Sequence, residues 1–142
     1  MGSKEDYFFV DTNIIVYCFD DATPHKKVKA INIMDELWDS RKGVLSLQVL
    51  KEFFVTVTLK LQNKMDSADA VNVVNDLLSW NIFLETKATF TKSIDIVNKY
   101  NFSIWDAGIL SSAIMSNCDV LYSEDLQNNQ IVEGVRIINP FV

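Results

Sequence analysis

Short apolar runs alternate with longer amphipathic stretches along the chain. The apolar runs, which predict strands, lie at residues 7–10, 43–46, 81–85, 119–123 and 135–139. Between them, helical patterns cover residues near 24–39, 47–63, 66–79, 88–100 and 104–116. Strands that are separated by helices are joined by right-handed crossovers, so this pattern predicts an α/β fold with a mainly parallel sheet and helices on both of its faces.

No Pro-, Gly- or Ser-rich linker, repeat or low-complexity tract interrupts this alternation. With 142 residues, 49% of them hydrophobic, the chain is long enough to bury a substantial core, and we expect one domain over residues 1–142. Residues 1–5 are expected to be a flexible N-terminus or a cloning remnant.

Two aspartates follow strand candidates at the edge of the sheet where ligands bind. Asp11 comes directly after the run 7–10, and Asp125 lies two residues after the run 119–123. Open parallel sheets bind ligands beyond the carboxyl ends of their strands, so both carboxylates are candidate site residues. Taken singly, Asp11 could instead cap a following helix and Asp125 could form a turn.

Two further acids lie among apolar residues on predicted helices. In the helix 104–116, a rotation of about 100° per residue places Asp106 within the apolar arc. In the helix 47–63, Glu52 falls in the smaller of two apolar arcs and is expected to point inward. The alternatives are a capping box with Ser103 at the N-cap for Asp106, and a partly exposed side chain for Glu52.

One shared cation site would explain these four acids, because an isolated carboxylate at such a position is costly. The four acids are Asp11, Glu52, Asp106 and Asp125. Mg²⁺ and Mn²⁺ prefer oxygen ligands, which is what carboxylates offer. Zinc is disfavoured, since the chain has one His and no close pair of Cys residues.

Charge and cysteine content narrow the possible functions. Nineteen acidic against thirteen basic residues give a net charge of -6, which disfavours a protein that coats nucleic acid electrostatically. A metal-dependent nuclease is compatible with this charge because bound metal ions reverse the local sign, and the acidity would also suit a basic partner protein.

The apolar runs are too short to span a bilayer, so no membrane association is expected. The distant Cys18 and Cys118 fit a reduced, cytoplasmic protein.

The remaining residues exclude two catalytic mechanisms. His25 stands at an expected exposed helix start, and without a second His or a Ser/His/Asp set neither a histidine acid–base pair nor a serine triad can operate. Water activated by a metal is then the remaining route to hydrolysis. The three tryptophans are expected to pack in the core, and no base-binding residue is assigned. These tryptophans are Trp38, Trp80 and Trp105.

Four segments of the chain resemble the successive motifs of PIN-domain nucleases. They are FFVDTNIIVY, SLQVLKEFF, SIWDAGILSSA and LYSEDLQ, the last followed by GVRIINPF. The resemblance covers essentially the whole chain and lies in the order and spacing of motifs that are weak singly. It implies a PIN-like three-layer α/β sandwich with about five parallel strands, and cleavage of phosphodiester bonds, usually in single-stranded RNA. Small members of the family are largely VapC-type toxins, so the resemblance also implies an antitoxin partner and a homodimer.

The resemblance assigns roles to individual residues. The family has a quartet of acids that binds Mg²⁺ or Mn²⁺. By the resemblance, the corresponding residues are Asp11, Glu52, Asp106 and Asp125. Asn13 and Ser123 match its supporting polar positions. We assign the three aspartates as direct metal ligands, and Glu52 as a ligand through water or as the residue that positions the nucleophile. Gln127 stands where many relatives carry a further acid, which leaves the number of metal ions open.

The sequence therefore favours a Mg²⁺- or Mn²⁺-dependent endoribonuclease that is the toxin of a toxin–antitoxin pair. Two alternatives stay open: an RNA-processing or DNA-structure nuclease without an antitoxin, and a non-catalytic binding module with a PIN fold. Four clustered carboxylates argue against the module, because a purely structural domain would be stabilised by their replacement.

Overall fold

The computed structural model describes residues 6–142, so the expectation of a flexible N-terminus or cloning remnant at residues 1–5 lies outside the described part. The strands are β1 (Phe8–Val10), β2 (Gly43–Ser46), β3 (Asn81–Phe83), β4 (Val120–Tyr122), β5 (Ile131–Val132) and β6 (Val135–Ile138). The helices are α1 (Thr12–Tyr17), α2 (Pro24–Ser40), α3 (Leu47–Val55), the π-helical η1 (Thr56–Lys60), α4 (Ser67–Leu77), α5 (Lys87–Tyr100) and α6 (Ile104–Met115).

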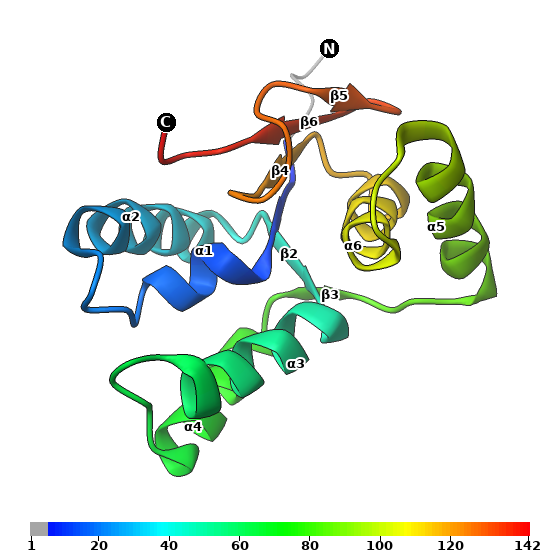
Figure 1. Ribbon diagram of the computed structural model, residues 1–142. Coiled ribbons are helices and arrows are strands. Elements are labelled where there is room, and N and C mark those ends of the chain that lie inside the picture. Colours follow the sequence, from blue (N-terminus) through cyan, green and yellow to red (C-terminus); the bar gives the residue numbers. More distant parts are fainter. Residues whose placement is uncertain (1–5) are drawn as a thin grey trace.

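The strands form one six-stranded sheet in the order β3-β2-β1-β4-β6-β5. Every neighbouring pair is parallel except β5 with β6, which is antiparallel. Helices α1 and α2 lie on one side of the sheet and α5 and α6 on the other, while α3 and α4 extend from one end (Figure 1). The predicted α/β fold with a mainly parallel sheet is confirmed, and the short β5 brings the predicted number of about five strands to six.

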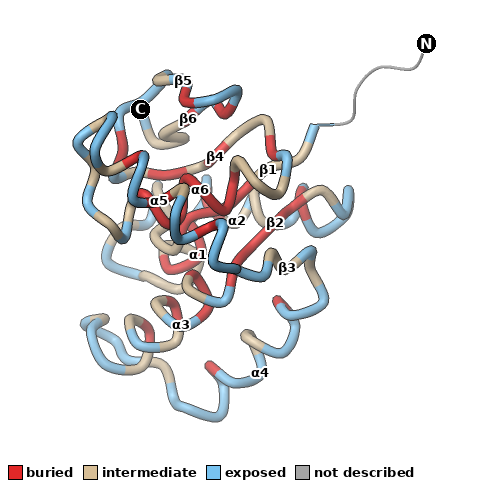
Figure 2. Tube along the Cα trace, turned by 90° about the vertical axis from the view of Figure 1, so that its right-hand side faces the viewer, coloured by how far each residue is buried: buried red, intermediate tan, exposed pale blue. Residues whose placement is uncertain are grey.

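The parallel pairing of β1 with β4 brings distant parts of the chain together. Phe9 pairs with Leu121 and Val10 with Tyr122, and the Asp11 amide donates to the Tyr122 carbonyl at 2.9 Å. Buried residues follow these strands and the inner sides of the helices (Figure 2). The residues that follow β1 and β4 consequently emerge side by side at the carboxyl edge of the sheet.

Two helices differ from the predicted elements. Helix α1 lies outside the predicted helices. It begins after β1 and is capped by Asp11, so the alternative role of this residue as a helix cap is confirmed. The helix predicted at 47–63 becomes π-helical after Val55 and ends at Lys60. At this change the Thr58 hydroxyl donates to the Phe54 carbonyl at 2.6 Å, a local bond that competes with regular helix geometry.

The three tryptophans do not share one environment. The rings of Trp38 and Trp80 pack against each other with centroids 6.1 Å apart, at the margin of the core. Trp105 is 69% exposed, so its predicted core packing is wrong, and Trp38 is also partly in solvent at 39%. Apolar neighbours in the helical pattern do not reveal that the first turn of α6 lies at the open edge of the sheet.

Both cysteines are free thiols. Burial raises the pKa of Cys118 to about 11 and that of Cys18 to about 12, so both stay protonated at neutral pH. Among the helices of residues 6–142, none has the length and apolar character that crossing a bilayer requires.

Gly43→Ala is expected to destabilise the protein. A Cβ atom at this position would lie 2.1 Å from the Trp80 ring, which is too close for any contact without movement of the ring or of β2. Overpacking of this kind costs about 1–3 kcal/mol. Urea unfolding would measure the loss, and Gly43→Ala combined with Trp80→Leu should recover part of it. A single variant as stable as wild type would contradict the predicted clash.

Candidate active site

Asp11 is a buried carboxylate at the carboxyl end of β1. Its side chain accepts hydrogen bonds from the Thr12 amide at 2.7 Å and from the Ser123 hydroxyl at 2.8 Å, and the residue is only 6% exposed. Burial raises the pKa of Asp11 to about 6, against the lowering effect of these two bonds, and repulsion from Asp125 and Glu52 adds to the rise. A carboxylate in this position gains from a nearby cation.

The loop after β4 carries the second acid. The Asp125 amide donates to the Ser123 hydroxyl at 3.2 Å, and the Asn13 side-chain amide donates to the Asp125 carboxylate at 2.9 Å. The Asn13 carbonyl oxygen accepts from the Glu124 amide at 3.3 Å. Ser123 and Asn13 therefore connect the start of α1 to this loop: the Ser123 hydroxyl donates to the Asp11 carboxylate, and the Asn13 amide donates to the Asp125 carboxylate.

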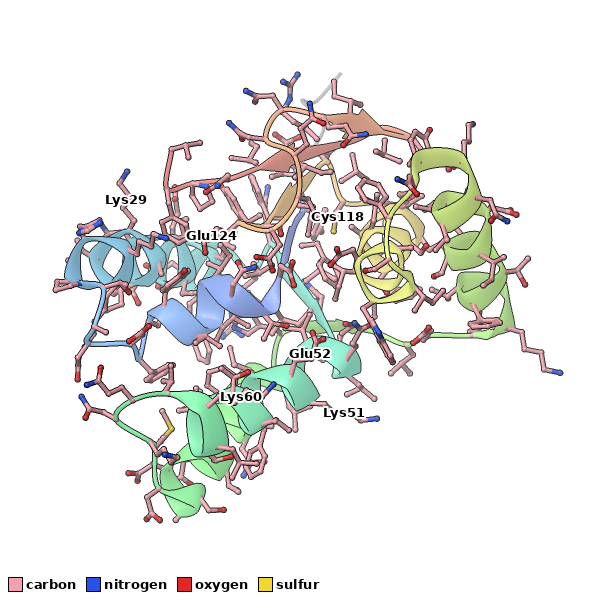
Figure 3. All side chains as sticks on the ribbon, viewed as in Figure 1. Lys29, Lys51, Glu52, Lys60, Cys118 and Glu124 are labelled. Atoms are coloured by element: carbon pink, nitrogen blue, oxygen red, sulfur yellow. The ribbon has the colours of Figure 1, made fainter. Side chains whose placement is uncertain are left out.

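Glu52 reaches the same region from α3. The Thr12 hydroxyl donates to its carboxylate at 2.8 Å, and the half-buried side chain stands on the side of α3 that faces α1 (Figure 3). Val55 and Leu59, which share its apolar arc in the sequence pattern, are 41% and 66% exposed. Val49, in the same arc, is buried in the core, so only the part of the arc around Val55 and Leu59 faces solvent. Glu52 itself lines the cleft between these two parts.

Asp106 lies in the first turn of α6. Its amide donates to the Ser103 hydroxyl at 3.1 Å, so the capping bond of the alternative interpretation is present. The residue is half-buried, and burial raises its pKa, with a further contribution from the negative charge of Asp125. Capping by Ser103 fixes the backbone of this turn and leaves the Asp106 carboxylate beside the other acids.

One cleft of about 550 Å³ is lined by all four predicted acids. They come from the end of β1, from α3, from α6 and from the loop after β4, and Asn13 lies with them. Ser123 does not line the cleft, because it is fully buried, but its hydroxyl donates to the Asp11 carboxylate from beneath. Gln127 is not part of this lining, and His25 is an exposed residue of the first turn of α2.

The cleft does not contain a ready-made coordination sphere. Within residues 6–142, no three His, Cys, Asp or Glu side chains are already arranged to hold a metal ion. The donor set is nevertheless of the kind that hard cations take, since carboxylate oxygens dominate it and no thiol or imidazole lines the cleft.

Sequence reasoning missed three residues around the four acids. Thr12 bonds Glu52, and Asp20 adds a fifth acid to the cleft. Glu124, between Ser123 and Asp125, accepts hydrogen bonds from the Tyr17 hydroxyl and from Lys26. The position of Thr12 directly after Asp11 could have indicated the first of these, whereas no periodicity relates Glu124 to a lysine 98 positions away.

Comparisons with known proteins bear on this arrangement. The family model described as PIN domain matches residues 8–132. A toxin–antitoxin complex from Klebsiella pneumoniae contains a similar chain, with 18% identity, a TM-score of 0.71, and coverage of 95% of this chain and 98% of that one. The toxin VapC20 of Mycobacterium tuberculosis, described as cleaving the sarcin–ricin loop, is 15% identical with a TM-score of 0.62 over 83% of this chain and 89% of that one.

A third solved structure, VapBC2 from Rickettsia felis bound to a DNA fragment from its promoter, is 16% identical with a TM-score of 0.64, and covers 92% of this chain and 96% of that one. Among curated proteins, none matches significantly. At these identities the solved structures show a shared fold, and the family model spans most of the sequence. The chain belongs to the PIN domain family.

Proposed function

We propose that this protein is a Mg²⁺- or Mn²⁺-dependent endoribonuclease that cleaves single-stranded RNA and acts as the toxin of a toxin–antitoxin pair. One observation carries the proposal: four acids from four separate segments of a PIN domain line a single cleft at the carboxyl edge of its parallel sheet. The similar structures support it, since one is a toxin that cleaves the sarcin–ricin loop and others are toxin–antitoxin complexes.

The residues of the cleft divide the work of hydrolysis. Asp11, Asp106 and Asp125 would hold the cation, and Glu52 would hold it through water or orient the attacking water. A bound Mg²⁺ or Mn²⁺ ion supplies activated water and offsets the charge that develops on the leaving oxygen. Hydrogen bonds from Ser123, Asn13 and Thr12 hold three of the four carboxylates, which reduces the rearrangement needed when the cation binds.

Cleavage of a single-stranded RNA oligonucleotide should require added Mn²⁺ or Mg²⁺ and should stop in excess EDTA. The metal requirement follows from the four carboxylates, which need a cation to bind a phosphodiester, and from the absence of a histidine in the lining of the cleft. His25→Ala should remain fully active, because this side chain is exposed outside the cleft. Cleavage that continues undiminished in EDTA would exclude the mechanism, and absence of cleavage with either metal would favour the non-catalytic module.

Glu124→Ala is expected to weaken metal binding although the residue holds no metal in this proposal. Glu124 fixes the loop between Ser123 and Asp125 through Lys26, whose ammonium group also lies 5.0 Å from the Tyr17 ring centroid. Loss of such an outer contact typically costs 10- to 100-fold in metal affinity, so a titration of the melting temperature should need about 10-fold more Mn²⁺.

Glu133→Ala is the matched control, because Glu133 also pairs with a lysine, Lys92, but lies outside the cleft. Its Mn²⁺ titration should coincide with that of wild type. Equal titrations for the Glu124 and Glu133 variants would show that the Glu124 contacts do not position the site.

An antitoxin would inhibit the enzyme by placing a basic side chain among the acids. The four carboxylates repel one another without a cation, and an Arg side chain binds carboxylates bidentately. The net charge of -6 would also attract a basic peptide. Inhibition by the co-encoded partner should therefore weaken as free Mn²⁺ rises. Inhibition that is independent of Mn²⁺ and of every basic residue of the partner would indicate occlusion elsewhere and leave the nuclease assignment intact.

A further inference from the structure

A second cavity of about 800 Å³ adjoins the acidic cleft. Both spaces are lined by Gln48, Lys51, Glu52 and Trp105, so one continues into the other. Beyond these shared residues the second cavity is mainly apolar, with Phe90 and Leu84 in its lining. A molecule that occupies the cleft and extends past Glu52 therefore enters an apolar space.

Large apolar side chains of this cavity are left in solvent. Trp105 is 69% exposed, Leu84 63% and Phe90 56%. A gathering of exposed apolar residues beside a polar site marks a place of binding, because each of them would be stabilised by leaving water. Neither helix formation nor core packing explains an exposed indole at Trp105, directly before Asp106.

The Trp105 backbone is held in place. Ser103 caps the helical turn that contains Trp105, and the Gln48 side-chain amide donates to the Trp105 carbonyl at 3.4 Å. A Cβ atom at Gly108 would lie 3.1 Å from the Gln48 side-chain oxygen, so the glycine leaves room for this bridge between α3 and α6. The indole is thus attached to a fixed turn of backbone, one residue from a proposed metal ligand.

Charge limits how the protein could hold RNA. The net charge is -6, and the basic residues that line the two spaces are Lys51 and Lys60. Few phosphates can be neutralised by side chains there, so contacts with bases should supply part of the affinity besides the proposed cation. Aromatic rings supply such contacts, since a stacked base contributes about 1–3 kcal/mol whatever its identity.

We propose that the second cavity is a nucleobase subsite, in which an unpaired base next to the scissile phosphate stacks on Trp105 while Lys51 contacts the adjoining phosphate. This inference rests on the proposed function, because it takes single-stranded RNA as the occupant of the cleft. RNA fits better than an apolar peptide, since the cavity opens directly into the proposed phosphodiester site and a lysine stands where the two meet. Base edges also carry N–H groups, which can donate hydrogen bonds to the Gln48 side-chain oxygen or to the Glu85 carboxylate.

The test measures equilibrium binding of a fluorescein-labelled 12-nucleotide single-stranded RNA by anisotropy. Ca²⁺ replaces Mn²⁺, because it takes the same oxygen ligands, and a gel verifies that the RNA stays intact. Trp105→Ala should weaken binding about 5- to 100-fold, and Trp105→Phe should retain most of the affinity. Ile131→Ala, which truncates a side chain 56% exposed on β5, should bind as wild type.

A series of RNAs with one abasic nucleotide each identifies the stacked base. At one position, removal of the base should weaken binding to wild type but cause no further loss with Trp105→Ala. Lys51→Ala should reduce the slope of log affinity against log salt by about 1, whereas Trp105→Ala should leave this slope unchanged. The salt slope separates a phosphate contact from a stacking contact.

Unchanged RNA affinity with Trp105→Ala would overturn the subsite and point to a protein partner as the occupant of the cavity. The subsite would also be overturned if, at every abasic position, the loss from base removal simply added to the loss from Trp105→Ala. Failure of the wild-type protein to bind RNA would overturn it as well. The proposed function is judged separately, by Mn²⁺-dependent cleavage with the wild-type protein. Cleavage without coupling between Trp105 and one base would reject the subsite alone, and coupling without cleavage would reject the nuclease alone.

Discussion

Asp106→Asn is expected to lower RNA cleavage by on the order of 100-fold and to abolish the rise in melting temperature that Mn²⁺ causes in wild type. Asn keeps the size of the side chain, and the backbone bond from residue 106 to the Ser103 hydroxyl does not depend on the carboxylate. The helix should therefore form as before. What the substitution removes is one negative charge from a cleft that we propose holds a cation.

The stability measurement tests the shared site without relying on activity. A ligand that binds only the folded state stabilises it by about 2.7 kcal/mol at 100 times its Kd, so Mn²⁺ should raise the melting temperature of wild type clearly. Asp95→Asn, on the exposed face of α5, is the matched control and should show the wild-type shift. If Asp106→Asn and Asp95→Asn respond equally to Mn²⁺, Asp106 is not part of a metal site.

The sequence could predict where Asp11 and Asp125 lie, because each follows a strand and the carboxyl ends of parallel strands share one edge. It could not predict that these two strands are neighbours. The order of strands depends on how the whole chain packs, and β1 lies between β2 and β4 although β2 is the next strand in sequence and β4 comes two strands later. Contact between Ser123 and Asp11, 112 positions apart, follows from that order.

Helical periodicity identified Glu52 and Asp106 as acids within apolar arcs, but it did not show whether those arcs face the core or a cleft. An apolar arc shows which residues share a side of a helix, and does not tell a core from a cleft. The same weakness led to the wrong prediction for Trp105, whose apolar neighbours are buried while its own ring is exposed. Trp105 is apolar by pattern and exposed in the structure, and we propose that binding takes the place of packing there.

Contacts of Glu124 could not be predicted at all. Tyr17 ends α1 and Lys26 lies in the first two turns of α2, and both meet Glu124 only because the loop after β4 passes over these helices. Phe141, near the end of the chain, adds its ring 5.6 Å from the same lysine. Such clusters of half-buried residues from distant segments leave no pattern in a single sequence.

Asp11→Asn is expected to stabilise the metal-free protein above pH 6 by about 2–3 kcal/mol. The pKa of Asp11 is raised from 3.8 to about 6 by burial, so between these values the folded state keeps a proton that the unfolded state has released. Stability therefore falls as pH rises from about 4 to about 6, and above that range the folded state carries the full cost of a buried charge. Asn avoids this cost and is equally able to cap α1.

The measurement is urea unfolding in EDTA at several pH values for both proteins. Their difference isolates Asp11 from Asp106, whose pKa is also raised by burial. The two curves should meet near pH 4 and separate up to pH 6, while Asp66→Asn, at an exposed N-cap without a side-chain bond, should follow wild type throughout. Parallel curves for wild type and Asp11→Asn would show that the buried charge is not penalised.

Addition of Mn²⁺ at pH 7 should reverse the order of the two proteins. Wild type gains the free energy of metal binding, whereas Asp11→Asn lacks one of the four negative charges of the cleft, at a buried position, and gains little. A residue that served only to cap α1 would show no such reversal, because both side chains cap equally well. The reversal thus separates the two roles of Asp11: in the proposed site its carboxylate destabilises the metal-free fold, and binding of the cation should restore more stability than its burial removes.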